Sequence, residues 1–190
     1  MKIIRDGISR HRLRAAIRQL AAGGLIAYPT EAVFGLGCDP DNIAAIKAIL
    51  ELKKRPLDKG LILIAADFKQ LLPYIELSDV PNSRQVLKTW PGPVTWLIRA
   101  TSSVPVWLRG EHESIAVRVT AHPVAAQLCR EFGKPLVSTS ANPSGCPPAR
   151  STLKTRLYFG YTNLLIVNGA VGGERKATAI FDARTSARLR

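Results

Sequence analysis

Apolar positions along the chain follow two spacings, which predict interleaved helices and strands. A spacing of three to four residues follows Ser9 and again follows Asp41-Asn42, residue types that cap the starts of helices. Gly23-Gly24 ends the first of these helices and Pro56 ends the second. Further helices are predicted at 67–74, 84–90, 123–132 and 152–158. Short, mostly apolar runs predict buried strands at 25–28, 61–64, 94–98, 115–119, 135–138, 164–167 and 179–181.

The order of these elements predicts the fold class. Strands interleaved with helices are typical of an α/β or α+β protein with a twisted, mixed β-sheet and flanking helices. The spacing is too irregular for a strict doubly wound fold. No internal repeat or low-complexity linker divides the chain, so we expect residues 1–190 to form one domain. A chain of this length buries about 70% of its unfolded surface, which is enough for one sizeable core.

The composition narrows the class of protein. No apolar run approaches the roughly 20 residues that a membrane span needs, so no membrane contact is expected. The N-terminus lacks the order of charged and apolar residues that marks a signal peptide, which favours the cytoplasm. Cys38, Cys129 and Cys146 have no partner ligands at short spacing, so we expect reduced, mostly structural thiols and no metal site.

The net charge of the chain says more about its binding partners than the rest of its composition does. Its 27 basic and 14 acidic residues give a net charge of +13. The excess gathers at both ends, with six basic residues and one acid in residues 1–20 and eight basic residues and two acids in residues 147–190. Such a surface attracts polyanions, including RNA, DNA and nucleotide phosphates. Aromatic residues make up only 6% of the chain and are scattered, so they offer no stacking platform for bases.

The most informative segment is 135–145, P-L-V-S-T-S-A-N-P-S-G. A buried strand is predicted to end here and to present Ser138, Ser140 and Asn142 in quick succession. Polar side chains at the carboxyl end of a strand are where open α/β sheets place ligands. Hydroxyl and amide groups without a carboxylate suit an anionic or zwitterionic guest, although a plain polar turn would have the same sequence.

Two segments that precede it carry related chemistry. Residues 28–40 place Thr30 at the tip of a strand, and Gly35 and Gly37 then permit a turn or a close approach of other atoms. Residues 52–60 hold four cations at the end of a helix. The helix dipole accounts for the first two of these cations but explains Arg55 and Lys59 poorly, because both lie around the proline that has ended the helix. We interpret this segment as an anion clamp.

Two further segments are open to more than one interpretation. Trp90-Pro91-Gly92-Pro93 makes a stiff entry into the strand that contains Thr95, and on residue types alone a structural turn is the better explanation. Arg118 interrupts the apolar strand 115–119, and a buried arginine needs an anionic partner. That partner is either a carboxylate of the protein or a carboxylate or phosphate of a ligand.

Several sequence motifs are missing, which limits the chemistry. The chain has no G-x-x-x-x-G-K-[ST], H-E-x-x-H, G-x-S-x-G or C-x-x-C motif. Ser138 and Ser140 therefore indicate hydrogen-bonding groups instead of activated nucleophiles. The expected chemistry is charge stabilisation and positioning, which is what phosphoryl or nucleotidyl transfer mainly requires of a protein.

Taken together, these segments resemble the YrdC/TsaC family, the threonylcarbamoyl-adenylate synthases. The matching stretches are YPTEAVFGLGCDP at 28–40, LKKRPLDKGLILIA at 52–65, WPGPVTWLI at 90–98, SIAVRVTAHP at 114–123 and KPLVSTSANPSG at 134–145. Five blocks in the family's order make a specific match, and the length resembles the short bacterial form. The resemblance implies a twisted α/β sheet with a large, basic concave surface.

The resemblance also implies a reaction and its partners. Family members combine L-threonine, bicarbonate and ATP into threonylcarbamoyl-AMP and release pyrophosphate, with Mg²⁺ accompanying the ATP. Partner proteins then transfer the threonylcarbamoyl group to adenosine 37 of tRNA, giving the t6A modification. The alternative that the charge suggests is an RNA-binding or ribosome-assembly factor with a basic groove.

Carried onto this sequence, the resemblance implies two sets of ligand contacts. Lys53 and Arg55 match the family's K-x-R motif and are the expected catalytic residues. The expected ATP contacts are Lys53, Arg55, Lys59, Thr95, Ser138, Ser140 and Asn142. The expected threonine contacts are Thr30, Arg118 and Thr178. No metal ligand of the protein is expected.

The chain departs from the family pattern near its C-terminus. The family carries a Ser-Thr or Pro-Ser block before an apolar-Asp ending, whereas residues 176–182 here read K-A-T-A-I-F-D. Thr178 keeps a hydroxyl and Ala179 does not, which leaves the contribution of Thr178 open. The basic tail 184–190 either covers the site or forms a loose end.

Overall fold

The structure is a computed structural model, and it describes residues 8–80, 83–174 and 176–190. The strands are β1 (Leu25–Pro29), β2 (Phe34–Gly37), β3 (Ile62–Ala65), β4 (Val94–Arg99), β5 (Ser114–Val119), β6 (Leu136–Ser140), β7 (Leu164–Ile166) and β8 (Ala179–Asp182). The α-helices are α1 (Arg10–Ala21), α2 (Ile43–Lys53), α3 (Ser83–Lys88), α4 (Val106–Arg109), α5 (Pro123–Phe132) and α6 (Thr152–Phe159). Short 3₁₀ helices are η1 (Leu57–Lys59), η2 (Phe68–Tyr74) and η3 (Leu77–Asp79).

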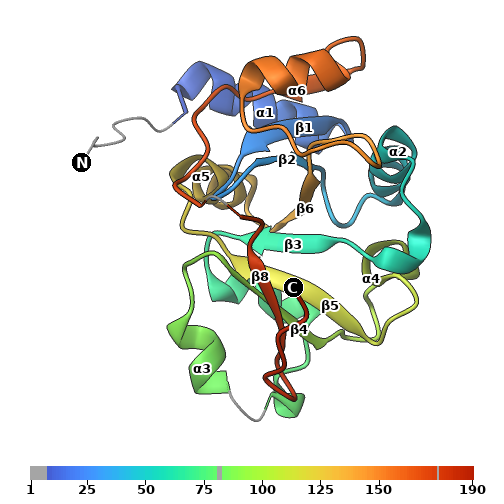
Figure 1. Cartoon of the computed structure of the whole chain (residues 1–190), viewed down its shortest axis with the longest axis vertical. Helices are drawn as coiled ribbons and strands as arrows, with labels where there is room; N and C mark the ends of the chain where they lie inside the picture. Colours follow the sequence, from blue (N-terminus) through green and yellow to red (C-terminus); the bar gives the residue numbers. More distant parts are fainter. Residues whose placement is uncertain (1–7, 81–82, 175) are drawn as a thin grey trace.

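One mixed sheet runs through the molecule in the order β7-β1-β2-β6-β3-β5-β4-β8. Figure 1 shows α6 and α1 beside β1 and β2, with β4, β8 and α3 toward the opposite end. The predicted fold class is confirmed, because parallel and antiparallel pairs share this sheet and helices flank it. None of the described helices is long and apolar enough to cross a membrane.

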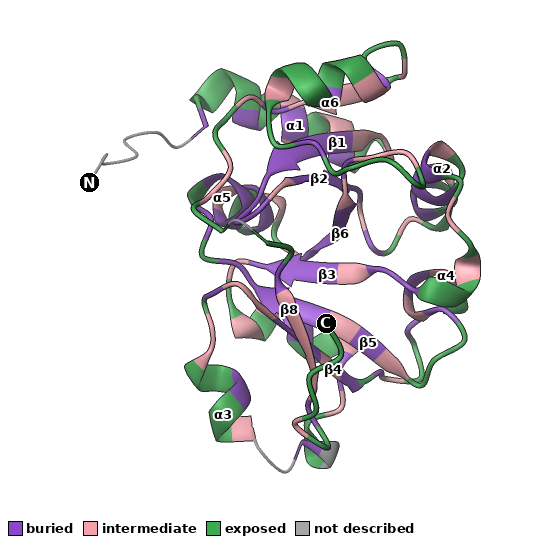
Figure 2. Cartoon of the chain, viewed as in Figure 1, coloured by how far each residue is buried: buried purple, intermediate pink, exposed green. Residues whose placement is uncertain are grey.

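Side chains alternate across the sheet and build separate cores on its two faces. On β3, Leu63 packs with residues of α2, whereas its neighbour Ile64 packs with residues of α1 and α5. A third cluster joins β1 and β2 to Phe159 of α6. Figure 2 shows that burial is concentrated in the central strands and in the inward sides of the helices. The central strands therefore form a fixed frame for the loops at their ends.

The predicted caps of the first two helices are confirmed. Ser9 accepts a hydrogen bond at its side chain from the amide of Arg12 and caps α1. Asn42 rather than Asp41 caps α2, since its Oδ1 accepts from the amide of Ala45 at 3.0 Å. The seven predicted strands are all present. The helix predicted at 67–74 is a 3₁₀ helix with Pro73 inside it, because a proline inside an α-helix removes a hydrogen bond and clashes with the preceding turn.

Strand β2 was not predicted, since Phe34-Gly35-Leu36-Gly37 was interpreted as part of a turn. The turn is confined to residues 30–33, and the chain then pairs antiparallel with both β1 and β6. A Cβ on Gly37 would lie 2.7 Å from both Tyr28 Cε1 and the Val137 carbonyl oxygen. The glycine permits this close packing, and neither Gly35 nor Gly37 has a positive φ.

Candidate functional site

Segments far apart in the sequence meet at a hollow of about 190 Å³. Antiparallel pairing of β6 with β2 and β3 places Ser140 opposite Gly35 and Ser138 opposite Ile62. Six of the ten predicted site residues line this hollow. They are Thr30, Arg55, Arg118, Ser138, Ser140 and Thr178.

Gly35 keeps space open in the wall of the hollow. A Cβ at this position would lie 3.2 Å from Ser138 Oγ and 3.4 Å from Thr30 Cγ2. The hydroxyl of Thr30 donates to the Val33 carbonyl at 2.7 Å, which fixes its rotamer. The missing side chain therefore leaves room between two of the predicted ligand contacts.

The partner of Arg118 is a carboxylate of the protein, Glu31. Arg118 Nη2 lies 3.2 Å from Glu31 Oε2, and both side chains are buried. Arg118 Nη1 donates to Thr178 Oγ1 at 2.8 Å. Glu31 was not predicted as a site residue. A lone buried arginine needs an anionic partner, and this need was the sequence signal that could have led to Glu31. The sequence did not say which acid, or which ligand, is that partner.

Lys53 is buried behind the hollow and does not line it. Its ammonium donates to the carbonyls of Ser140 and Asn142, the second at 2.8 Å, and to Asn142 Oδ1 at 3.4 Å. The Asn142 amide in turn donates to the carbonyls of Pro143 and Cys146. Burial, and then the charge of Arg55, lower the pKa of Lys53 to about 8. Lys53 and Asn142 thus hold the loop that follows β6.

Arg55 faces the hollow from the other side. Its Nη2 donates to the carbonyls of Gly60 at 2.9 Å and of Lys59 at 3.2 Å, and burial lowers its pKa. Lys59 itself is exposed at the end of η1 and does not line the hollow. Thr95 is fully buried on β4, and its hydroxyl has no hydrogen-bond partner within the described part of the chain. Lys59 and Thr95 are therefore not brought into the hollow.

The basic tail reaches the hollow through Arg190. Residues after β8 turn back along that strand, with the amide of Leu189 donating to the Ile180 carbonyl at 2.8 Å. Arg190 Nε and Nη2 donate to the Thr178 carbonyl at 3.2 and 3.1 Å. Burial and the charges of Arg118 and Arg55 lower the pKa of Arg190. Three guanidinium groups thus share one small hollow, and this excess of positive charge suits an anionic guest.

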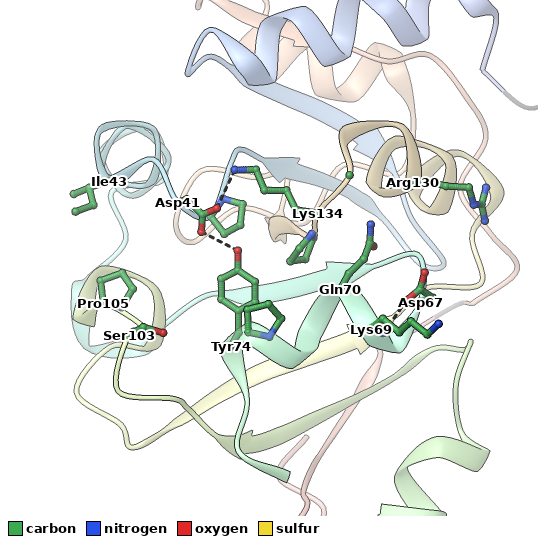
Figure 3. Close-up of a pocket in the computed structure, with 14 residues that line it drawn as sticks. Asp41, Ile43, Asp67, Lys69, Gln70, Tyr74, Ser103, Pro105, Arg130 and Lys134 are labelled. Atoms are coloured by element: carbon green, nitrogen blue, oxygen red, sulfur yellow. Dashed lines mark hydrogen bonds and ion pairs between the residues drawn. The ribbon is translucent and has the colours of Figure 1, made fainter.

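A larger hollow of about 890 Å³ lies elsewhere and shares no lining residue with the first (Figure 3). Its lining carries both acidic and basic side chains, which are Asp41, Asp67, Lys69, Arg130 and Lys134. Lys134 Nζ lies 2.9 Å from Asp41 Oδ2, and the Tyr74 hydroxyl donates to Asp41 Oδ1 at 2.8 Å. None of the predicted site residues lines it. Because the larger hollow has a mixed lining and holds none of the predicted site residues, the smaller, arginine-rich hollow is the better candidate.

Metal ligands do not gather in the portion that the structure describes, since no group of three or more His, Cys, Asp or Glu side chains comes together there. The cation-rich hollow is suited to stabilise anions by charge and by hydroxyl donors.

Comparison with known proteins establishes the family of this chain. The family model Sua5_yciO_yrdC, described as "Telomere recombination", matches residues 18–189. The chain belongs to the Sua5/YciO/YrdC family. Family members named threonylcarbamoyl-AMP synthase are 54% identical in Nitrosococcus oceani, over 94% of this chain and 97% of the relative, and 51% identical in Methylococcus capsulatus, over 96% and 98%.

Solved structures of Sua5/YciO/YrdC proteins have the same fold. A P. abyssi Sua5 crystal structure in complex with L-threonine is 32% identical, with a TM-score of 0.83 over 93% of this chain and 52% of that one. This chain therefore spans about half the length of that Sua5. E. coli YciO, at 24% identity, has a TM-score of 0.82 over 97% of this chain and 89% of that one, which is a likeness of fold.

Proposed function

We propose that this family member is a threonylcarbamoyl-AMP synthase that joins L-threonine, bicarbonate and ATP and releases pyrophosphate. The observation that carries the proposal is one hollow that combines the hydroxyls of Thr30, Ser138 and Ser140 with the guanidinium groups of Arg55, Arg118 and Arg190. Relatives that bear this name match nearly the whole chain at 51–54% identity, which supports the same activity here.

The reaction needs what the hollow offers. The amine of threonine attacks the carbon of bicarbonate and a hydroxyl group leaves as water, giving a carbamate. A carbamate oxygen then attacks the α-phosphorus of ATP, and the bond to the β-phosphate oxygen breaks as pyrophosphate leaves. Two anions must approach each other in this step. Positive groups that are already in position lower that repulsion and stabilise the departing pyrophosphate.

On the amino-acid side we assign Thr30, Arg118 and Thr178 to L-threonine. The positive charge of Arg118 is complementary to the carboxylate of threonine. Thr178 Oγ1 accepts a hydrogen bond of 2.8 Å from Arg118. The P. abyssi Sua5 complexed with L-threonine supports an amino acid as guest of this fold.

On the nucleotide side we assign Arg55 and Lys59 to the phosphates, and Ser138 and Ser140 to the nucleotide. We keep Arg55 as a catalytic residue, whereas Lys53 and Asn142 would act through the loop that they hold. The enclosed Thr95 would reach ATP only after a rearrangement. Ligand cavities usually measure about 300–1,000 Å³. The 190 Å³ hollow accommodates the amino-acid part, so ATP with its Mg²⁺ would extend along the open mouth.

Pyrophosphate release tests this function directly. The purified chain is mixed with ATP, Mg²⁺, bicarbonate and L-threonine, and pyrophosphate is followed by a coupled assay. We expect release that depends on L-threonine and that falls when L-serine replaces it. Equal release with and without threonine would contradict the proposal.

The product of this reaction is an activated carbamate, which a group-transfer enzyme must consume. We infer that the chain acts in the cytoplasm and supplies a t6A-forming system that modifies adenosine 37 of tRNA. That step involves RNA and partner proteins, and the strongly basic surface of this chain supports contact with the RNA.

A specific surface favours RNA contact as a second role. Arg10, Arg14 and Arg18 line a groove of about 600 Å³ between α1 and α5. Their side chains are exposed and have no hydrogen-bond or ion-pair partner among the residues that the structure describes. Residues four apart on a helix are separated by about 6 Å along its axis, so this row can follow a phosphate backbone. This surface lies outside the arginine-rich hollow, since the two share no residue.

Salt dependence of tRNA binding tests this role. We compare the wild type with Arg10→Gln/Arg14→Gln/Arg18→Gln and with a control of equal charge loss, Lys69→Gln/Lys88→Gln/Arg130→Gln. The α1 variant should lower the slope of log affinity against log salt by about 0.7–0.9 for each lost phosphate contact. Binding should persist with saturating ATP. If both triple variants weaken binding equally, the RNA contact is non-specific attraction to the whole surface.

A further inference from the structure

We propose that Glu31 is a positioning residue, which fixes the guanidinium of Arg118 for the carboxylate of the amino-acid substrate. The inference rests on the proposed function and adds a residue that lies in the matched stretch 28–40 but was not among the predicted ligand contacts. Glu31 lies behind Arg118 instead of lining the hollow, so it acts through Arg118.

The two oxygens of the Glu31 carboxylate have different partners: Oε1 accepts hydrogen bonds, whereas Oε2 makes an ion pair with Arg118 without a hydrogen bond. Oε2 lies 3.2 Å from Arg118 Nη2. Oε1 accepts hydrogen bonds from Thr120 Oγ1 at 2.6 Å and from the amide of Ala121 at 3.1 Å. The side chains of Arg118 and Glu31 are only 5% and 8% exposed, so water screens this pair little. The hydrogen bonds to Thr120 and Ala121 thus fix the carboxylate relative to the segment that follows β5. Its position therefore does not depend on the rotamer of Arg118.

Two of the three nitrogens of Arg118 have a partner. Nη1 donates a hydrogen bond to Thr178 Oγ1 at 2.8 Å, and Nη2 forms the ion pair with Glu31. Nε has no hydrogen-bond partner in the described part of the molecule. The guanidinium of Arg190 is near enough to be repelled by Arg118, since the charge of Arg118 contributes to the lowered pKa of Arg190. Glu31 is the acidic residue that offsets this repulsion, because it is the carboxylate paired with Arg118.

Thr30 and Glu31 are neighbours in the turn between β1 and β2, but they have different tasks. Thr30 lines the hollow, whereas Glu31 forms an ion pair with Arg118. The backbone of this turn is held independently, by the amide of Gly172 on the Thr30 carbonyl at 2.9 Å and the amide of Glu174 on the Glu31 carbonyl at 3.2 Å. One rigid turn therefore sets the separation of two groups that we assign to the same substrate. Removing the charge of Glu31 should loosen Arg118 while this turn stays in place.

The test variant is Glu31→Gln, which keeps the size of the side chain and an oxygen for Thr120. We expect the KM for L-threonine to rise about tenfold or more, while the KM for ATP changes less than threefold. Glu31→Asp, which keeps the charge on a shorter arm, should fall between Gln and the wild type. The matched control is Glu76→Gln, which removes the half-exposed ion pair with Arg99 at 3.4 Å and should leave both KM values unchanged.

Two measurements guard against a merely structural effect. Thermal unfolding reports folding, and calorimetric titration with L-threonine reports binding without turnover. If Glu31→Gln folds poorly, Thr120→Val serves instead, since it removes the 2.6 Å hydrogen bond to the carboxylate and keeps the charge; its threonine affinity should also fall.

The possible outcomes separate the inference from the proposed function. An active wild type with an unchanged threonine KM and affinity in these variants overturns the inference alone. A parallel loss for ATP and threonine also overturns it, because that result indicates general damage. A wild type that neither binds threonine nor releases pyrophosphate with it overturns both.

Discussion

At the scale of single residues, Lys53 differs most from its expected role. The sequence predicts a cation that meets phosphates, yet the ammonium is directed at carbonyl oxygens of the loop after β6. An ammonium has three donors, and all three have acceptors within the protein. A phosphate contact would have to displace one of them. Lys53 thus supports Ser140 in the wall of the hollow from behind.

The burial of Lys53 predicts a dependence of stability on pH. Its pKa is lowered from 10.5 to about 8 by folding. Between these two pH values the unfolded chain binds more protons than the folded one, so the contribution of Lys53 to the free energy of unfolding rises with pH and is constant below about pH 8. Denaturant unfolding of the wild type and of Lys53→Met from pH 7 to 10 measures it. The wild type should gain stability relative to the variant across this range; parallel curves would contradict the lowered pKa.

At the scale of elements, seven of the eight strands were predictable because each is a short, mostly apolar run. Strand β2 was not, because two of its four residues are glycines, which carry no hydrophobic signal. Only the pairing with β1 and β6 reveals what these glycines do. Helix α4 was also missed, since a helix of four residues is too short for a periodic pattern.

The two glycines of β2 should respond differently to the same substitution. Gly35→Ala places a methyl group 3.2 Å from Ser138 Oγ and 3.4 Å from Thr30, at the wall of the hollow. We expect a several-fold higher KM for L-threonine and little loss of stability. Gly37→Ala places it 2.7 Å from the Tyr28 ring and from the Val137 carbonyl, which should cost about 1–3 kcal/mol of stability.

Thermal unfolding and threonine kinetics on both variants measure this contrast. Equal effects of the two substitutions on KM would show that Gly35 has no particular relation to the substrate.

At the scale of the whole molecule, the sequence predicted the chemical types in the site better than their arrangement. The hydroxyls of β6 and the lone arginine of β5 carry a local signal. Glu31 and Arg190 do not, because their contacts join residues far apart. Glu31 meets Thr120 across 89 positions, and Arg190 meets Arg118 where both arginines donate hydrogen bonds to Thr178. Such partners follow from the strand order, which periodicity cannot supply. Of the tail 184–190, which was left open as cover or loose end, Arg190 lines the hollow.

The net charge of +13 is likewise a property of the whole chain, and the structure concentrates positive charge at two separate places. Three arginines converge in the hollow, and another three follow one face of α1. The first set surrounds one small hollow and suits small anions, whereas the second lies along an exposed helix face and suits a polyanion. A single composition value could not distinguish these two surfaces.

The central claim is that the arginine-rich hollow joins threonine, bicarbonate and ATP in one product. The most direct measurement is mass spectrometry of the reaction with ¹³C-bicarbonate, with pyrophosphate quantified in the same sample. The account predicts a labelled threonylcarbamoyl adenylate in equal amount to the pyrophosphate, and the loss of both with Arg55→Ala. Pyrophosphate without a labelled adenylate, or a product that forms equally well in the variant, would contradict it.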